Sequence, residues 1–167
     1  MFPGSLKYRR YLGVGFHDRN KEEKGVTNLD YKRVMGLDVG DVRIGVAVSD
    51  LLMLTAQGIE SYTRKNEDET IAHLKKLATD YNVYKVVCGL PINMNGTMGE
   101  QAQKTQDFAA KLKENLGLEI VFMDERLTTA SATRTLIEAD VSRRNRKKYV
   151  DKLSAVYILQ AFIDSKR

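Results

Sequence analysis

From Val34 onward the chain alternates between short apolar runs and longer segments with apolar residues at helical spacing. Short apolar runs bounded by glycine, proline or charged residues are typical of buried strands, whereas apolar residues recurring three or four positions apart predict helices. The expected strands are 34–39, 44–48, 56–62, 85–88 and 119–123, and the expected helices are 67–81, 97–116, 129–139 and 149–163. This order predicts an α/β fold in which a hairpin leads a mixed sheet covered by helices.

Two helix boundaries carry their own sequence signals. Thr97 and Glu100 have the spacing of a capping box, whose two side chains bind backbone N–H groups at the start of a helix. Gly117 predicts the end of the same helix because glycine readily adopts the left-handed conformation found after helix ends. The segment therefore reads as a helix that begins at the Thr97 cap.

Residues 1–33 show no sustained period, so we expect an extension outside the fold, flexible at least in part, and a single domain over 34–167. This segment holds eight Lys or Arg against four Asp or Glu, so it carries most of the formal charge of +5. A second hypothesis is a mis-assigned gene start, with Leu29 or Met35 as the initiator, because Glu22 to Val26 is compatible with a purine-rich ribosome-binding sequence.

Composition excludes several classes of protein. No apolar run approaches the roughly 20 residues that a membrane span needs. No signal peptide is evident, and the single cysteine, Cys88, lies in an apolar run and cannot form an internal disulfide. We therefore expect a soluble, cytoplasmic protein without a membrane partner.

Asp38 interrupts a strand whose other residues are apolar. A buried carboxylate costs several kcal/mol unless it is paired, protonated or bound to a metal. Gly36 and Gly40 beside it would allow a ligand or a backbone segment to approach closely. A strand-end aspartate that caps a turn towards Asp41 and Arg43 explains Asp38 equally well.

Asp124 and Glu125 follow the last expected strand, at the strand end where α/β folds place their chemistry. Neighbouring strand residues face opposite ways, so we expect only one of the two to enter a site. The structural alternative is an ion pair with Arg126.

Asp151 shares a helix face with the apolar Ala155, Ile158 and Phe162. The structural alternative is that an aspartate in the first turn of a helix is stabilised by the positive end of the helix dipole. Together, however, three distant segments each deliver a carboxylate to a strand end or an inward helix face. Such a group repels itself unless a divalent cation neutralises it, and oxygen ligands suit Mg²⁺ or Mn²⁺.

A basic segment leads into Asp151 and favours a nucleic-acid partner over an ordinary solvated loop. Arg43 and the loop before the Thr97 cap could contact the same backbone, since amides and hydroxyls at a helix N-terminus suit phosphate. Ordinary turn chemistry explains that loop equally well. The predicted nucleic-acid contacts are Arg143, Arg144, Arg146, Lys147, Lys148, Lys152, Arg43, Asn95 and Thr97.

Five motifs in order resemble the YqgF family: Met35–Gly40, Arg43–Asp50, Gly89–Thr97, Asp124–Thr129 and Asp151–Gln160. The resemblance covers residues 34 to about 163 and leaves 1–33 without a counterpart. It implies an RNase H-like fold, with a five-stranded sheet in the order 3-2-1-4-5 and helices on both faces. It also implies cytoplasmic maturation of the 5′ end of pre-16S rRNA by a metal-dependent nuclease.

The acidic positions of the family correspond here to Asp38, Glu125 (or Asp124) and Asp151 as catalytic and metal-binding residues. RNase H-like nucleases often carry a further acid at the end of the fourth strand, where this chain has Gly89-Leu90-Pro91, so a four-acid cage is not expected. Two alternatives remain: a Holliday junction resolvase-like nuclease of branched DNA, and a non-catalytic rRNA-binding assembly factor. A two-domain actin-like ATPase also uses Asp-x-Gly before a hairpin, but this chain is too short for it.

Overall fold

The computed structural model describes residues 31–126 and 143–167, with side chains over 31–126 and 149–167. The expected extension (apart from its last three residues) and the expected helix 129–139 lie outside these ranges. The elements are β1 (Arg33–Val39), β2 (Arg43–Ser49), β3 (Ala56–Thr63), α1 (Glu67–Asp80), β4 (Val83–Leu90), α2 (Glu100–Leu116), β5 (Glu119–Asp124) and α4 (Arg143–Asp164). No helix in the described part of the chain is both long and apolar enough to cross a membrane.

The five strands form one mixed sheet in the order β3-β2-β1-β4-β5. The hairpin strands β1 and β2 are antiparallel, as are β2 and β3, whereas β4 runs parallel to both β1 and β5. This topology confirms the expected hairpin-led sheet and its order. The carboxyl ends of β1, β4 and β5 therefore meet at one edge, where Asp38 lies opposite Gly45 of β2.

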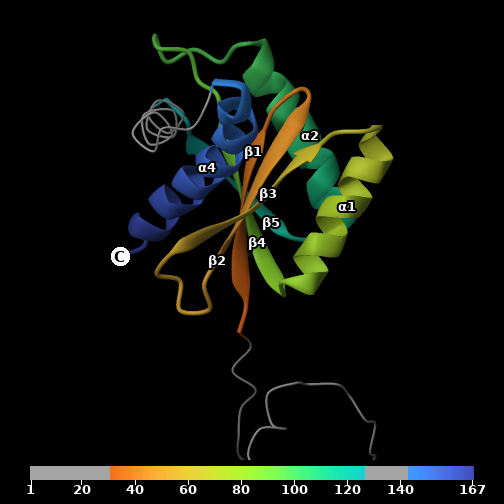
Figure 1. The fold of residues 1–167 in the computed structure, drawn as a ribbon, viewed down its shortest axis with the longest axis vertical. Helices are drawn as coiled ribbons and strands as arrows, with labels where there is room; N and C mark the ends of the chain where they lie inside the picture. Colours follow the sequence, from red (N-terminus) through yellow and green to blue (C-terminus); the bar gives the residue numbers. More distant parts are fainter. Residues whose placement is uncertain (1–30, 127–142) are drawn as a thin grey trace, which may run out of the picture.

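Helices cover both faces of the sheet, with α1 and α2 on one side and α4 on the other (Figure 1). Strand alternation explains the two layers: Met35 and Leu37 point into the α1/α2 core, while Val34 points into the α4 core. Each fully buried aliphatic side chain contributes roughly 1.5–3 kcal/mol through the apolar surface it removes from water. The two cores thus hold the helices to the sheet independently.

Helix α4 lies unusually close to the sheet because glycines face it from four adjacent strands. A Cβ atom built on Gly45 would stand 1.8 Å from the Asp151 carbonyl oxygen, and one on Gly36 would stand 2.7 Å from the Leu159 Cβ. Such distances are far below ordinary contact, so any side chain there would push the helix away. Gly58 and Gly89 face the same side of the sheet, but a Cβ there would first meet the Lys152 side chain and the Glu125 carboxyl, respectively.

Two helix starts differ from the sequence prediction. The capping box is wrong: Gly99 is the N-cap of α2 and makes no side-chain cap bond, while the Thr97 hydroxyl donates to the Asn95 side chain at 2.6 Å. Helix α4 begins at Arg143 rather than near Tyr149, so the basic segment forms its first turns instead of a loop. The predicted end at Gly117 is confirmed, with φ of 65°.

Candidate active site

Asp38 and Glu125 come to the same face of the sheet through strand alternation. Asp38 follows Val34 and Gly36, which face α4, and Glu125 continues the series that places Met123 in the α4 core. The backbone N–H of Glu125 donates to the Leu90 carbonyl at 3.2 Å, which fixes the residue beside the end of β4. Both carboxyl groups therefore lie at the carboxyl edge of the sheet, as the sequence predicted.

The Glu125 carboxyl lies directly over Gly89. A Cβ on Gly89 would stand 2.1 Å from Glu125 Oε1, so only glycine at this position leaves room for the acid. Burial and the negative charge of Asp38 raise the pKa of Glu125 to about 8. The glycine that takes the place of a fourth acid thus makes space for an acid from the next strand.

The pKa of Asp38 also lies above its ordinary value. Burial first, and the nearby charge of Asp151 second, raise the pKa of Asp38 to about 6, while the Ser154 hydroxyl lowers it. Ser154 is 1% exposed, and its Oγ makes no regular hydrogen bond within the described residues. The sequence analysis did not single out Ser154, although its helical spacing of three from Asp151 places it on the same face.

Asp151 reaches the same edge from α4 and is held by polar partners. Its Oδ2 accepts a charge-assisted hydrogen bond from Arg43 Nε at 2.8 Å and a second from the Ser61 hydroxyl at 3.2 Å. The first-turn explanation of Asp151 is wrong, because α4 begins eight residues earlier and its first turn contains no acid. Ser61 was not predicted, since only the register places it opposite Gly45.

Asp124 does not join the half-buried carboxyl groups. It is exposed and pairs with Arg126, whose Nε lies 2.8 Å from Asp124 Oδ2. Hydrogen bonds from Arg126 hold the pKa of Asp124 below its ordinary value. Of the two adjacent acids, Glu125 is therefore the one that lies at the same edge of the sheet as Asp38.

The donor chemistry at this edge suits a hard divalent cation. Two half-buried carboxyl groups repel each other when both are ionised. A Mg²⁺ ion is commonly held by one or two carboxylates, with waters and substrate phosphates completing its shell. No three His, Cys, Asp or Glu side chains in the described ranges converge closely enough to hold an ion. Asp38 and Glu125 therefore fit such an ion as a pair, with Asp151 engaged by Arg43.

The predicted nucleic-acid contacts lie in three parts of the fold: α4, the start of β2 and the loop after β4. Arg143, Arg144, Arg146, Lys147 and Lys148 lie in the first turns of α4, and their side chains fall outside the described ones. The stem of Lys152 lies across Gly58, next to Asp151 in the chain. Asn95 and Thr97 are exposed and hydrogen-bond each other, so that loop has an ordinary turn structure.

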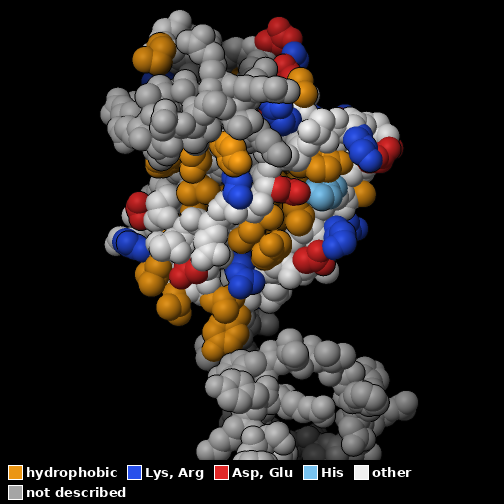
Figure 2. Space-filling model, viewed as in Figure 1, with side chains coloured by type: hydrophobic (Ala, Val, Ile, Leu, Met, Phe, Trp, Pro, Cys, Tyr) orange, Lys and Arg blue, Asp and Glu red, His pale blue; other side chains and the backbone are white. Residues whose placement is uncertain are grey.

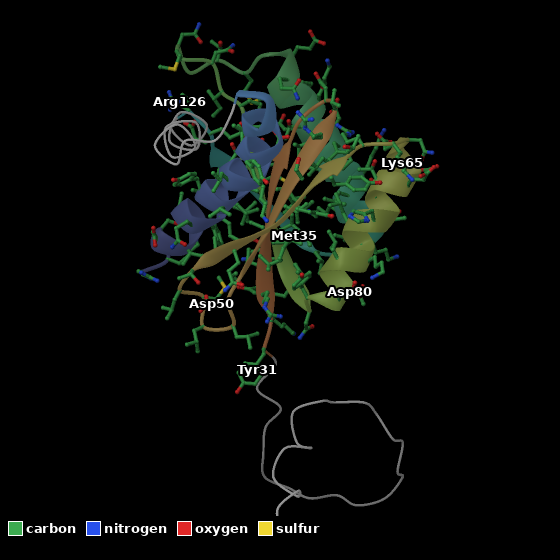
Figure 3. The ribbon with its side chains drawn as sticks, viewed as in Figure 1. Tyr31, Met35, Asp50, Lys65, Asp80 and Arg126 are labelled. Carbon is green, nitrogen blue, oxygen red and sulfur yellow. The ribbon has the colours of Figure 1, made fainter. Side chains whose placement is uncertain are left out.

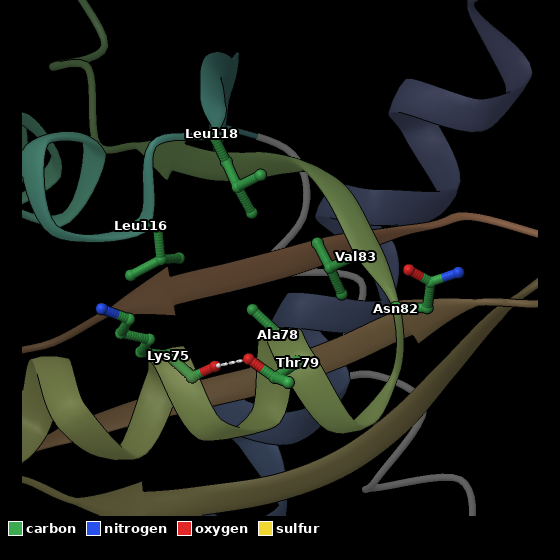
Figure 4. Close-up of a pocket in the computed structure, with 7 residues that line it drawn as sticks. All are labelled: Lys75, Ala78, Thr79, Asn82, Val83, Leu116 and Leu118. Atoms are coloured by element: carbon green, nitrogen blue, oxygen red, sulfur yellow. Dashed lines mark hydrogen bonds between the residues drawn. The ribbon is translucent and has the colours of Figure 1, made fainter. Parts of the chain in front are cut away.

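Figure 3 places Arg126 and Lys65 at the upper end of the molecule and Asp50 and Asp80 at the lower end. A cavity of about 210 Å³ lies near the beginning of β4, so it is distant from the carboxyl edge; its lining is Lys75, Ala78, Thr79, Asn82, Val83, Leu116 and Leu118 (Figure 4). Exposed leucines of the β2–β3 turn also lie at the lower end, where Figure 2 shows apolar side chains together. Neither feature belongs to the acidic site.

A family model described as "RuvX: Holliday junction resolvase" matches residues 32–165. The chain belongs to this family. The resemblance to YqgF is thereby confirmed, because RuvX and YqgF denote the same family. The RuvX chain is 53% identical to a Clostridium acetobutylicum protein named "Putative pre-16S rRNA nuclease" over 133 residues, which are 80% of this chain and 98% of the relative. A Clostridium novyi protein of the same name is 54% identical with the same coverage.

Two solved structures share the fold of the RuvX chain. The RuvC protein of Thermus thermophilus, in complex with a Holliday junction substrate, superposes with a TM-score of 0.51 at 13% identity, covering 81% of this chain and 95% of that one. The fowlpox virus Holliday junction resolvase gives a TM-score of 0.51 at 15% identity, covering 81% and 99%. These similarities confirm the expected RNase H-like architecture.

Proposed function

We propose that this RuvX-family chain is a metal-dependent nuclease that hydrolyses phosphodiester bonds during maturation of the 5′ end of pre-16S rRNA in the cytoplasm. The observation that carries the proposal is the half-buried pair Asp38 and Glu125, which lie together at the carboxyl edge of the sheet and whose pKa values are both raised. Perturbed carboxyl groups collected at such an edge are typical of functional sites. The family match and the names of the clostridial relatives support the substrate.

In this mechanism Asp38 and Glu125 would hold a Mg²⁺ or Mn²⁺ ion, with Asp151 as a third ligand once it leaves Arg43. An ion held there would lower the pKa of an attacking water and stabilise negative charge on the leaving 3′-oxygen. Gly89 keeps space for the Glu125 carboxylate, because a Cβ there would overlap its Oε1. Arg43, Lys152 and the basic turns of α4 bind the nucleic-acid backbone, with little selection among bases.

Asp38→Asn tests the assignment. This change keeps the side-chain shape but removes the negative charge, so cleavage of a pre-16S rRNA fragment in Mn²⁺ should fall at least about a hundredfold. Asp80→Asn, an exposed acid at the end of α1, is the matched control and should cleave at the wild-type rate. Undiminished cleavage by a correctly folded Asp38→Asn protein would rule out the proposed site.

The family description also favours a second candidate, the cleavage of branched DNA. Competition between a four-way DNA junction and the rRNA fragment, at one salt concentration, separates the two substrates. A protein that binds the rRNA but cleaves neither substrate in Mg²⁺ or Mn²⁺ would instead be a non-catalytic assembly factor. Removing residues 1–30, which precede β1, should leave the cleavage rate unchanged, because the proposed nuclease domain consists of the sheet and helices that follow.

A further inference from the structure

The ion pair between Arg43 and Asp151 occupies one of the three carboxylates of the proposed metal site. Arg43 is the first residue of β2, and its backbone carbonyl accepts from the Gly40 N–H at 2.9 Å, which fixes the turn that presents it. Two residues later, Gly45 brings the β2 backbone against the Asp151 backbone. The pairing therefore depends on the close packing of α4 on β2, as well as on the two side chains.

The same carboxylate also acts on Asp38. Asp38 lies opposite Gly45 in the β1–β2 register, and Gly45 lies against the Asp151 backbone, so the two acids come from neighbouring positions. The negative charge of Asp151 accordingly contributes to the raised pKa of Asp38. Both members of the ion pair are about one quarter exposed, at 25% for Arg43 and 24% for Asp151, so a ligand can approach them from solvent.

We propose that Arg43 withholds Asp151 from the metal until a substrate phosphate takes the guanidinium. This inference rests on the proposed function and adds an order of assembly to it. A guanidinium binds phosphate and carboxylate with the same two-pronged hydrogen bonding, so a backbone phosphate competes directly with Asp151. Once released, Asp151 becomes the third oxygen ligand beside Asp38 and Glu125, and the complete site exists only with nucleic acid bound.

A double-mutant cycle tests the metal side of this exchange, with Mn²⁺ alone as the probe in isothermal titration. Arg43→Gln should tighten Mn²⁺ binding roughly tenfold, the lower end of what partners of metal ligands contribute to affinity. In the Asp151→Asn background the same change should give almost no gain, because there is no carboxylate to release. Lys152→Gln removes an equal charge beside Asp151 and controls for general electrostatics.

The wild type, Arg43→Gln, Asp151→Asn and the double variant also test the nucleic-acid side of the exchange. Their affinities for a short RNA duplex are measured in EDTA, where no cleavage occurs. Asp151→Asn should tighten RNA binding because it frees the guanidinium, and the gain should vanish when Arg43→Gln is added. Ser61→Ala weakens the hold on Asp151 without changing any charge. It should shift both affinities in the same directions by a smaller factor, and it covers the case in which a charge variant fails to fold.

If the second substitution leaves the gain in Mn²⁺ or RNA affinity of a single variant undiminished, the proposed exchange is wrong, because such a gain would reflect through-space charge alone. Absence of either gain in folded single variants would overturn it as well. These outcomes are distinguishable from failure of the proposed function. If Asp38→Asn binds Mn²⁺ as the wild type does, the metal site itself is wrong, whereas the RNA cycle still reports on the Arg43–Asp151 pair.

Discussion

Glu125→Gln should make the metal-free protein more stable, and increasingly so as the pH rises. The pKa of Glu125 is raised from 4.5 to about 8 in the folded chain. Between these values the unfolded chain releases its proton while the folded chain retains it, so the wild type loses stability as pH increases. One pKa unit corresponds to about 1.4 kcal/mol, so the loss reaches roughly 3 kcal/mol at pH 7. Glutamine does not titrate and avoids it.

The assay is thermal unfolding in EDTA at a series of pH values from 4.5 to 9. At about 3 °C per kcal/mol for a chain of this size, the variant should melt roughly 10 °C above the wild type near pH 7 and close to it at pH 4.5. Glu114→Gln, an exposed acid of α2, should show no such divergence. Adding Mn²⁺ should restore the melting temperature of the wild type and leave that of Glu125→Gln unchanged. Parallel curves for wild type and variant would refute the argument from burial and repulsion.

Two further predictions concern the framework of the site. Gly45→Ala should cost about 3 kcal/mol or more, measured by urea unfolding, because its methyl group would overlap the Asp151 carbonyl and displace α4; an unchanged midpoint would contradict the close packing. Gln160→Ala should cost about 1–2 kcal/mol with no change in cleavage rate, because Gln160 accepts from the Ala56 N–H at 2.9 Å and donates to the Leu54 carbonyl at 3.2 Å, far from the acids. A matching loss of activity would show that the β2–β3 turn takes part in catalysis.

Strand alternation made much of the site predictable from the sequence. A carboxylate in an otherwise apolar strand was sufficient to single out Asp38, and the position after β5 was sufficient for the pair Asp124 and Glu125. Which of these two enters the site required knowing which face of β5 packs against α4, because Met123 on that face places Glu125, two residues later, over Gly89. In the sequence, Gly89 only marks the place where RNase H-like nucleases often carry a fourth acid. In the structure, its lack of a side chain leaves room for the Glu125 carboxyl.

Other features depended on contacts that no local pattern contains. Arg43 and Asp151 are 108 positions apart, and their pairing follows from the packing of α4 on β2. Apolar periodicity predicts the start of α4 too late because residues 143–148 contain no apolar position, although arginine and lysine are good helix formers. The Thr97 cap is absent because its hydroxyl oxygen accepts from the Asn93 side-chain amide within the loop, and Gly99 takes the N-cap position of α2.

The glycines facing α4 have a consequence for which substitutions the enzyme tolerates. Main-chain contact sets the separation between α4 and the sheet. The position of Asp151 relative to Asp38 therefore depends little on the side chains of the α1/α2 core, which lies on the other face. A library that varies that core should yield many active proteins of altered stability. A library at Gly36 and Gly45, where a Cβ would meet the α4 backbone, should instead lower activity even in the variants that still fold, at positions that carry no reactive group at all.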